Sequence, residues 1–265
     1  MYKLKVMLNK VPEITLYFWL IKILCTTVGE TFADFINGQL GLGLTNTSYV
    51  MGAVLLAVLF FQFKSKKYIP SIYWLAVVLL SIVGTLITDN LTDNFGISLE
   101  TTTIIFSIAL LITFIVWYIS EKTLSIHSIV TTKREVFYWL AILFTFALGT
   151  ASGDLIAEQF NIGYLPSAFI FLGAIAIITS AYYTIRRLLA VEHKYQAFYA
   201  ILAFWLAYIL TRPLGASIGD YLSQSPDDGG LGLGTTVTSA IFLVAILGLV
   251  IYLSATRRDQ IKKAE

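Results

Sequence analysis

Long apolar stretches separated by short polar connections extend over nearly the whole chain of 265 residues. A helix that crosses a bilayer needs about 20 predominantly apolar residues. Eight stretches fit this requirement, at about residues 14–36, 46–63, 70–90, 101–120, 135–157, 165–185, 197–221 and 235–254. The pattern predicts an all-α membrane protein with eight transmembrane helices in a single transmembrane domain over residues 1–265.

Positive charges occur in alternate connections, and this alternation predicts the topology. Lysine and arginine precede the first stretch, follow the last, and occupy the connections after the second, fourth and sixth. Neither residue occurs in the other four connections, residues 37–45, 91–100, 158–164 and 222–234. Because cytoplasmic loops carry an excess of Lys and Arg, we expect both termini in the cytoplasm (N-in/C-in) and those four connections outside.

The composition agrees with a membrane protein and argues against other classes. Charged residues make up 13% of the chain, against about a quarter in a typical soluble domain. The single cysteine, Cys25, excludes a disulfide within one chain. The sequence has no phosphate-binding loop or zinc-protease motif, so we expect no enzymatic activity and no cofactor. The basic residues follow the topology rather than one face, so a nucleic-acid partner is not expected.

A tryptophan opens each odd-numbered stretch and marks one copy of a repeated motif. In every copy, a glycine lies ten residues after the tryptophan and an aspartate fifteen residues after it. The sets are Trp19, Gly29 and Asp34; Trp74, Gly84 and Asp89; Trp139, Gly149 and Asp154; and Trp205, Gly215 and Asp220. Their alignment without gaps predicts four two-helix repeats, at about residues 14–63, 70–120, 135–185 and 197–254.

Two helices return the chain to the side from which it started, so the four repeats are parallel. Parallel repeats are related by an axis along the membrane normal. We therefore expect the four Trp-containing helices to meet at a common centre, in a fourfold or nested twofold arrangement. The second helix of each repeat would then belong to an outer layer.

The repeated Trp, Gly and Asp positions resemble those of a bacterial membrane-protein family defined by four tandem repeats of unknown function, each with two transmembrane helices and a tryptophan. The resemblance covers about residues 14–254. It implies the same eight-helix fold and gives no secure indication of activity. The expected location is the bacterial cytoplasmic (inner) membrane.

A polar stripe follows one face of each Trp-containing helix. At about 1.5 Å per residue, the aspartate lies about 22 Å along the helix from the tryptophan. Residues four positions before and after it share its face. The positions before it are Glu30, Thr85, Thr150 and Ala216, and those after it are Gly38, Asp93, Glu158 and Gln224. These stripes would face one another if the helices share a centre.

Acidic residues outnumber basic ones within the predicted helices at this depth. The acids are Glu30, Asp34, Asp89, Asp154 and Asp220, and the bases are Lys22 and Arg212. Ionisable groups inside a membrane are costly and normally face an interior or a watery cavity, so the acid excess predicts a bound cation or proton. Carboxylate and hydroxyl oxygens favour Mg²⁺, Mn²⁺, Ca²⁺ or H⁺ over copper or zinc.

We therefore predict a transporter or permease for a small cation, preferably a hard divalent metal exchanged for protons. The five acids would bind the metal, Thr85 and Thr150 would add neutral oxygens, and Arg212 would tune the charge. One alternative is a transporter of an organic or anionic solute that Arg212 binds. Another is a membrane scaffold or regulatory subunit in which the aspartates cap or staple helices. The expected partners are the lipid bilayer and a small ion or solute, and an oligomer is compatible with the sequence.

Several residues carry separate expectations. Lys22 should extend its amine to the cytoplasm, and the tryptophans should anchor the helices at the membrane interface. Arg212 should neutralise Glu30 or one of the aspartates, with anion binding as the alternative. Pro213 removes a backbone donor inside a predicted helix, so a kink or an unwound turn is expected there.

Overall fold

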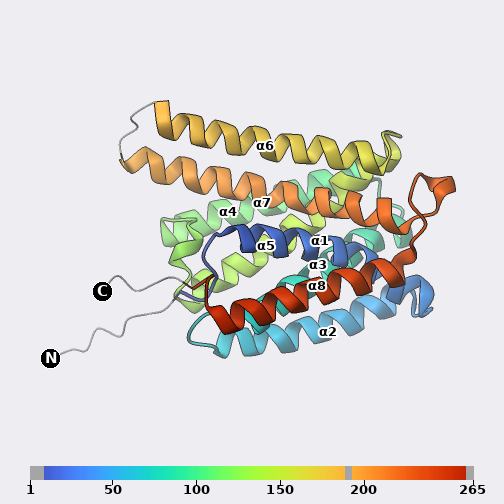
Figure 1. Ribbon diagram of the computed structural model, residues 1–265, viewed down its shortest axis with the longest axis horizontal. Helices are drawn as coiled ribbons and strands as arrows, with labels where there is room; N and C mark the ends of the chain where they lie inside the picture. Colours follow the sequence, from blue (N-terminus) through green and yellow to red (C-terminus); the bar gives the residue numbers. More distant parts are fainter. Residues whose placement is uncertain (1–8, 189–192, 261–265) are drawn as a thin grey trace.

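The computed structural model describes residues 9–188 and 193–260. Within these residues, eight α-helices run roughly side by side along one long axis (Figure 1). They are α1 (Leu16–Asp34), α2 (Gly43–Lys64), α3 (Pro70–Asp89), α4 (Leu99–Glu121), α5 (Thr132–Asp154), α6 (Tyr164–Leu188), α7 (His193–Ser223) and α8 (Gly234–Thr256). All eight are long and apolar enough to cross a membrane. The predicted all-α fold with eight such helices is confirmed.

Local sequence signals fix several helix ends. Thr15, Ser98 and Thr131 each accept a hydrogen bond from a backbone N–H in the first turn of α1, α4 and α5. These bonds satisfy donors that the start of a helix leaves free. Gly43 and Gly234 begin α2 and α8 with φ of 72° and 78°, a left-handed conformation that glycine adopts without strain.

The helices form an inner ring and an outer layer. The odd-numbered helices make the ring, since α1 and α5 each pack against both α3 and α7. In the most apolar part of each odd helix, 44% to 78% of the residues are buried, against 11% to 28% in the even helices. In Figure 1, α6 and α2 accordingly lie at opposite edges of the bundle. This is the arrangement expected for four parallel repeats.

The even helices interlock neighbouring repeats. Each packs mainly on the odd helix that follows it in the chain: α2 on α3, α4 on α5, and α6 on α7. The last one, α8, packs on α1 and so closes the ring. The first and fourth repeats are therefore joined in the same way as repeats that are adjacent in the sequence.

Both described ends of the chain lie at one end of the bundle, which we call the basic end. There the Lys10 Nζ pairs with the Glu135 Oε2 at 2.6 Å, and the Glu13 N–H donates to the Asp259 carbonyl at 2.8 Å. The connections without Lys or Arg lie at the opposite end, which we call the acidic end. Lysines that also contribute to the charge pattern lie outside the described residues, at positions 3, 5, 262 and 263.

Tryptophans and tyrosines fill the ring near the basic end. Trp74, Trp139 and Trp205 are at most 4% exposed, so the prediction that they anchor the helices at the membrane interface is wrong for these three. They face the neighbouring helices of the ring rather than the outer surface, whereas Trp19 is only partly buried. The hydroxyls of Tyr73 and Tyr138, each one residue before a tryptophan, share a hydrogen bond of 2.5 Å. A layer of packed aromatic rings thus closes the ring at this level.

Candidate functional site

The motif glycines let the odd helices touch one another. A Cβ at any of them would overlap a residue of the next odd helix around the ring, seven positions after its tryptophan. The pairs are Gly29 with Ser81, Gly84 with Phe146, Gly149 with Arg212, and Gly215 with Thr26. Because equivalent positions pair four times, the ring has approximate fourfold symmetry. Equivalent residues of the four repeats therefore lie at similar depth.

Three of the motif aspartates end their α-helices at a change of helix type. Asp34, Asp89 and Asp154 are each followed by a five-residue π-helix, at Phe35–Gln39, Asn90–Asn94 and Leu155–Gln159. Single π turns are rare and frequently occur at functional sites. The side chains of these aspartates do not cap the turns that follow them. The local backbone therefore leaves the three carboxylates free for other partners.

The aspartates of all four repeats line one cavity at the acidic end, which we call the acidic vestibule. Its volume is about 200 Å³, enough for several water molecules. The wall is formed by Glu30, Asp34, Asn37, Asp89, Thr92, Asp93, Leu99, Asp154, Glu158, Asp220 and Gln224. Glu30 and Asp220 are buried, whereas Asp93 and Glu158 are exposed at the rim.

The motif carboxylates have no partner in the described part of the protein. No N–H or O–H group there donates to the side chains of the four motif aspartates, and none of the ion pairs includes them. One oxygen from each of Glu30, Asp34 and Asp220 lies within 4.8 Å of the other two. Carboxylates from the first and fourth repeats therefore converge although they repel one another.

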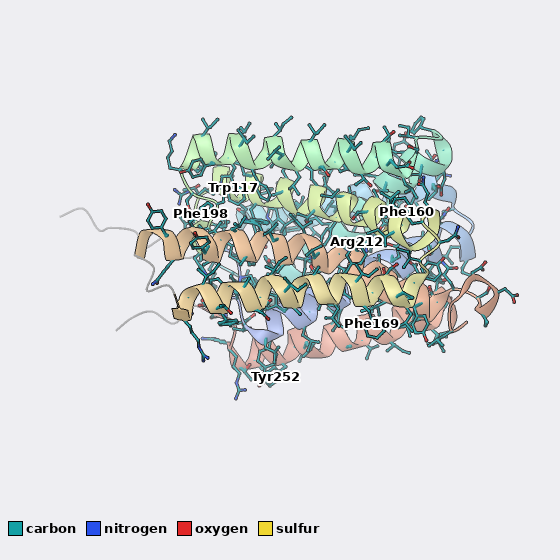
Figure 2. All side chains as sticks on the ribbon, turned by 90° about the horizontal axis from the view of Figure 1, so that it is seen from above. Trp117, Phe160, Phe169, Phe198, Arg212 and Tyr252 are labelled. Carbon is teal, nitrogen blue, oxygen red and sulfur yellow. The ribbon has the colours of Figure 1, made fainter. Side chains whose placement is uncertain are left out.

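Arg212 lies inside the bundle, next to the vestibule and toward the basic end (Figure 2). Its Nη1 donates to the Thr26 carbonyl at 2.6 Å. Its Nη2 lies within hydrogen-bonding distance of three acceptors, which share its two N–H groups: Glu30 Oε2 at 2.6 Å, Thr150 Oγ1 at 2.7 Å, and the Thr85 hydroxyl. The expected neutralisation of Glu30 is thus present. Thr85 and Thr150 contact the guanidinium instead of lining the cavity, because Arg212 reaches the centre of the ring at their level.

The helix around Pro213 is continuous. Helix α7 extends without interruption from His193 to Ser223, so the unwound turn that the sequence suggested is absent. The proline ring fits beside small residues of α5, because a Cβ on Gly149 or Gly153 would meet Pro213. The backbone on both sides of Pro213 therefore stays helical.

Lys22 is buried within the bundle, and the prediction that it extends to the cytoplasm is wrong. Its side chain lies against two aromatic rings, with Nζ 4.1 Å from the centre of the Phe146 ring and 4.3 Å from that of Tyr208. The residue is 1% exposed. The side chain points into the ring because Lys22 lies on the inner face of α1. The short distance of Lys22 from the start of the helix does not decide where the amine lies.

The structure brings all eight residues predicted for the site together, five in the wall of the vestibule and three in the layer beside it. The function of these residues stays a prediction. Asp93 and Glu158 belong to the wall as well, but sequence reasoning assigned them no role. Their position four residues after a motif aspartate, on the same stripe, was the signal that could have identified them.

These features define a helical protein of four parallel repeats around a central acidic cavity. One family model matches the chain four times, at residues 17–68, 72–123, 137–187 and 203–259. The chain belongs to this family, which is described as Repeat of Unknown Function (DUF347). Neither the curated proteins nor the solved structures include a match.

Proposed function

We propose that this protein transports a small hard divalent cation across the bacterial cytoplasmic membrane in exchange for protons. The observation that supports this proposal is that the motif aspartates of all four repeats line one cavity, and that their carboxylates lack a partner among the described residues. An acidic group in this setting needs a cation or a proton to offset its charge. The acidic vestibule is the binding site for that cation.

The oxygen spacing in the vestibule fits a hard divalent ion. Mg²⁺ binds oxygens at about 2.0–2.1 Å and Ca²⁺ at about 2.3–2.6 Å, so oxygens on one ion are separated by about 3 Å when adjacent and by up to about 5 Å when opposite. Glu30, Asp34 and Asp220 offer three oxygens within 4.8 Å of one another. Asp89 and Asp154 complete the ligand set directly or through water.

The outer surface and the charge pattern support a membrane location with both termini in the cytoplasm. Large apolar side chains are exposed on the outside of the bundle, including Phe169 at 62% and Phe198 at 59% (Figure 2). Apart from Lys22 and Arg212, which are buried inside the bundle, the lysines and arginines of the described residues lie at the basic end of the helices, as the positive-inside rule requires for the cytoplasmic side. The vestibule then opens to the outside of the cell.

The two alternative functions find less support in the contacts. In an anion transporter Arg212 would have to be available to the solute, but its terminal nitrogens donate to four protein oxygens. In a scaffold the aspartates would cap or staple helices, but Asp34, Asp89 and Asp154 do not cap the turns that follow them, and their side chains accept no hydrogen bond within the described part of the chain. Both observations favour a cation as the partner of the carboxylates.

Transport by purified protein in liposomes tests this proposal. We expect uptake of Mn²⁺ that falls at least tenfold in Asp89→Asn and Asp154→Asn, with little change in melting temperature. Asp227→Asn removes an exposed carboxylate at the same end but outside the vestibule, and is the matched control. If both vestibule variants take up Mn²⁺ at the rate of the unaltered protein, these carboxylates are not required for transport.

A further inference from the structure

Lys22 is an amine in the centre of the bundle that the vestibule does not use. Its Nζ is buried and has no hydrogen-bond acceptor among the described residues. The equivalent positions of the other repeats, three residues after each tryptophan, are Val77, Ile142 and Tyr208. The lysine is therefore a feature of the first repeat alone, which also supplies Glu30 to the vestibule.

The groups around Lys22 provide no negative charge. The titratable or charged neighbours are Cys25 on α1, and Tyr208 and Arg212 on α7. The hydrogen-bonded tyrosines Tyr73 and Tyr138 lie next to Tyr208. None of these is a carboxylic acid, and the two ring faces are the main polar contact of the amine.

Such an environment makes a purely structural role for the amine unfavourable. Ring faces attract a cation, but they replace only part of the hydration that a buried ammonium loses. An apolar side chain of similar volume would fill the same place without that cost. An intramembrane ionisable residue without a structural reason is by default a candidate for function.

The depth of Lys22 separates it from the vestibule by the Arg212 layer. Lys22 precedes Glu30 by eight residues on the same helix, or about 12 Å toward the basic end. Arg212 and its hydrogen-bond partners lie between the two levels. A divalent cation in the vestibule and a proton on Lys22 therefore do not share ligands, but they repel each other across a region of low dielectric.

We propose that Lys22 is the proton-carrying group of the cation–proton exchange. This inference rests on the proposed transport function and names the residue that couples it. When a divalent cation enters the vestibule from one side of the membrane, the Lys22 ammonium releases its proton to the water on that side and becomes a neutral amine. When the cation leaves on the other side, the amine takes up a proton from the water there. The proton on Lys22 and the cation in the vestibule thus alternate and cross the membrane in opposite directions.

The experiment uses the full-length protein in lightly buffered liposomes, with Mn²⁺ uptake and the internal pH followed together. Lys22→Met removes the titratable group, and Lys22→Arg keeps a charge that does not titrate. We expect both variants to bind Mn²⁺ with the affinity of the unaltered protein and to lose proton counterflow at least tenfold. Lys64→Met is the control, because Lys64 also contacts an aromatic ring, at 4.2 Å from Phe60, but lies at the end of α2.

Each outcome has a separate meaning. Proton counterflow that persists in a folded Lys22→Met protein overturns the role of Lys22, as does Mn²⁺ uptake without proton movement in the unaltered protein. Absence of Mn²⁺ binding by the unaltered protein overturns the transport function itself. If neither variant folds, the Nζ resonance of the buried lysine is recorded in labelled unaltered protein. An ammonium signal that Mg²⁺ leaves unchanged then contradicts the proposal.

Discussion

The guanidinium of Arg212 and the carboxylate of Glu30 form a buried ion pair of 2.6 Å between the fourth and first repeats. Hydroxyls of Thr85 and Thr150, from the second and third repeats, accept from the same nitrogen. All four copies therefore meet at one charged group. The first three supply Glu30 and the two threonines from equivalent positions, and the fourth supplies Arg212 from a position four residues earlier in its copy. The deviations between the repeats, rather than their shared motif, build this layer.

Removal of one partner of this pair should destabilise the protein strongly. Arg212→Ala leaves the buried Glu30 side chain without its donor, which we expect to lower the free energy of unfolding by about 3–5 kcal/mol. The double variant Glu30→Gln with Arg212→Gln removes both charges and should recover part of this loss. Equilibrium unfolding in detergent measures the free energy of unfolding of the single and the double variant. A loss below about 1 kcal/mol for Arg212→Ala would contradict the structural role of the pair.

The motif glycines should be sensitive to a single added methyl group. Gly84→Ala places a Cβ against Phe146 and the backbone of Ala147, and overpacking of this kind costs about 1–3 kcal/mol. Gly173→Ala, on α6 with no neighbouring atom within 4 Å, is the control and should be neutral or stabilising by up to about 1 kcal/mol. Equal thermal stability of the two variants would show that the ring helices are not in close contact at Gly84.

Repetition in the sequence made the ring of odd helices predictable. Trp, Gly and Asp recur at fixed spacing, so equivalent depth follows from the repeat alone. The four-residue spacing along one helix face then placed Glu30, Thr85 and Thr150 at one level. This spacing could not predict the partner of each side chain, because the contact between Thr85 and Arg212 depends on how far a long side chain reaches across the ring.

Side-chain direction explains where the sequence misled. Lys22 and the tryptophans lie near the ends of apolar stretches, where residues of these types normally reach the interface. Here Lys22 and three of the four tryptophans face into the ring, and hydrophobicity alone does not distinguish a helix face buried in protein from one that contacts lipid. Pro213 lies within the continuous helix α7, and the glycines of α5 leave room for its ring.

The packing of Asp259 and the C-terminal segment against the bundle should become less stable as the pH rises. Burial raises the pKa of Asp259, although the Tyr68 hydroxyl donates to its carboxylate at 2.5 Å and lowers it in part. A carboxyl whose pKa is raised by folding contributes stability at low pH, which is lost as the pH rises through the folded-state pKa. The Glu13 amide donates to the Asp259 carbonyl, so its protection from hydrogen exchange, corrected for the intrinsic exchange rate, measures this loss of stability and should fall as the pH rises.

The same amide in Asp259→Asn provides the control for this pH effect. The variant lacks the titrating group, so protection of the Glu13 amide should no longer depend on pH in this range. Identical pH dependence in the variant and the unaltered protein would show that another group is responsible.

The rim acids should assist binding in a salt-dependent manner. Asp93→Asn and Glu158→Gln remove exposed carboxylates from the vestibule wall, and each should weaken Mn²⁺ binding by about 2–5-fold at low ionic strength. The Debye length falls to about 3 Å at 1 M salt, so the difference should disappear there. An effect that persists at high salt would instead identify these residues as direct ligands.

Equilibrium binding of Mn²⁺ to the purified protein, followed by electron paramagnetic resonance, tests the central claim most directly. If the motif carboxylates form one cation site, the unaltered protein binds one tightly held ion. Asp34→Asn, Asp89→Asn and Asp154→Asn should each lose more than tenfold in affinity, or about 1.4 kcal/mol, with melting temperatures close to that of the unaltered protein. Asp227→Asn should bind as the unaltered protein does. Undiminished binding in all three vestibule variants, or no binding by the unaltered protein, would contradict the cation site.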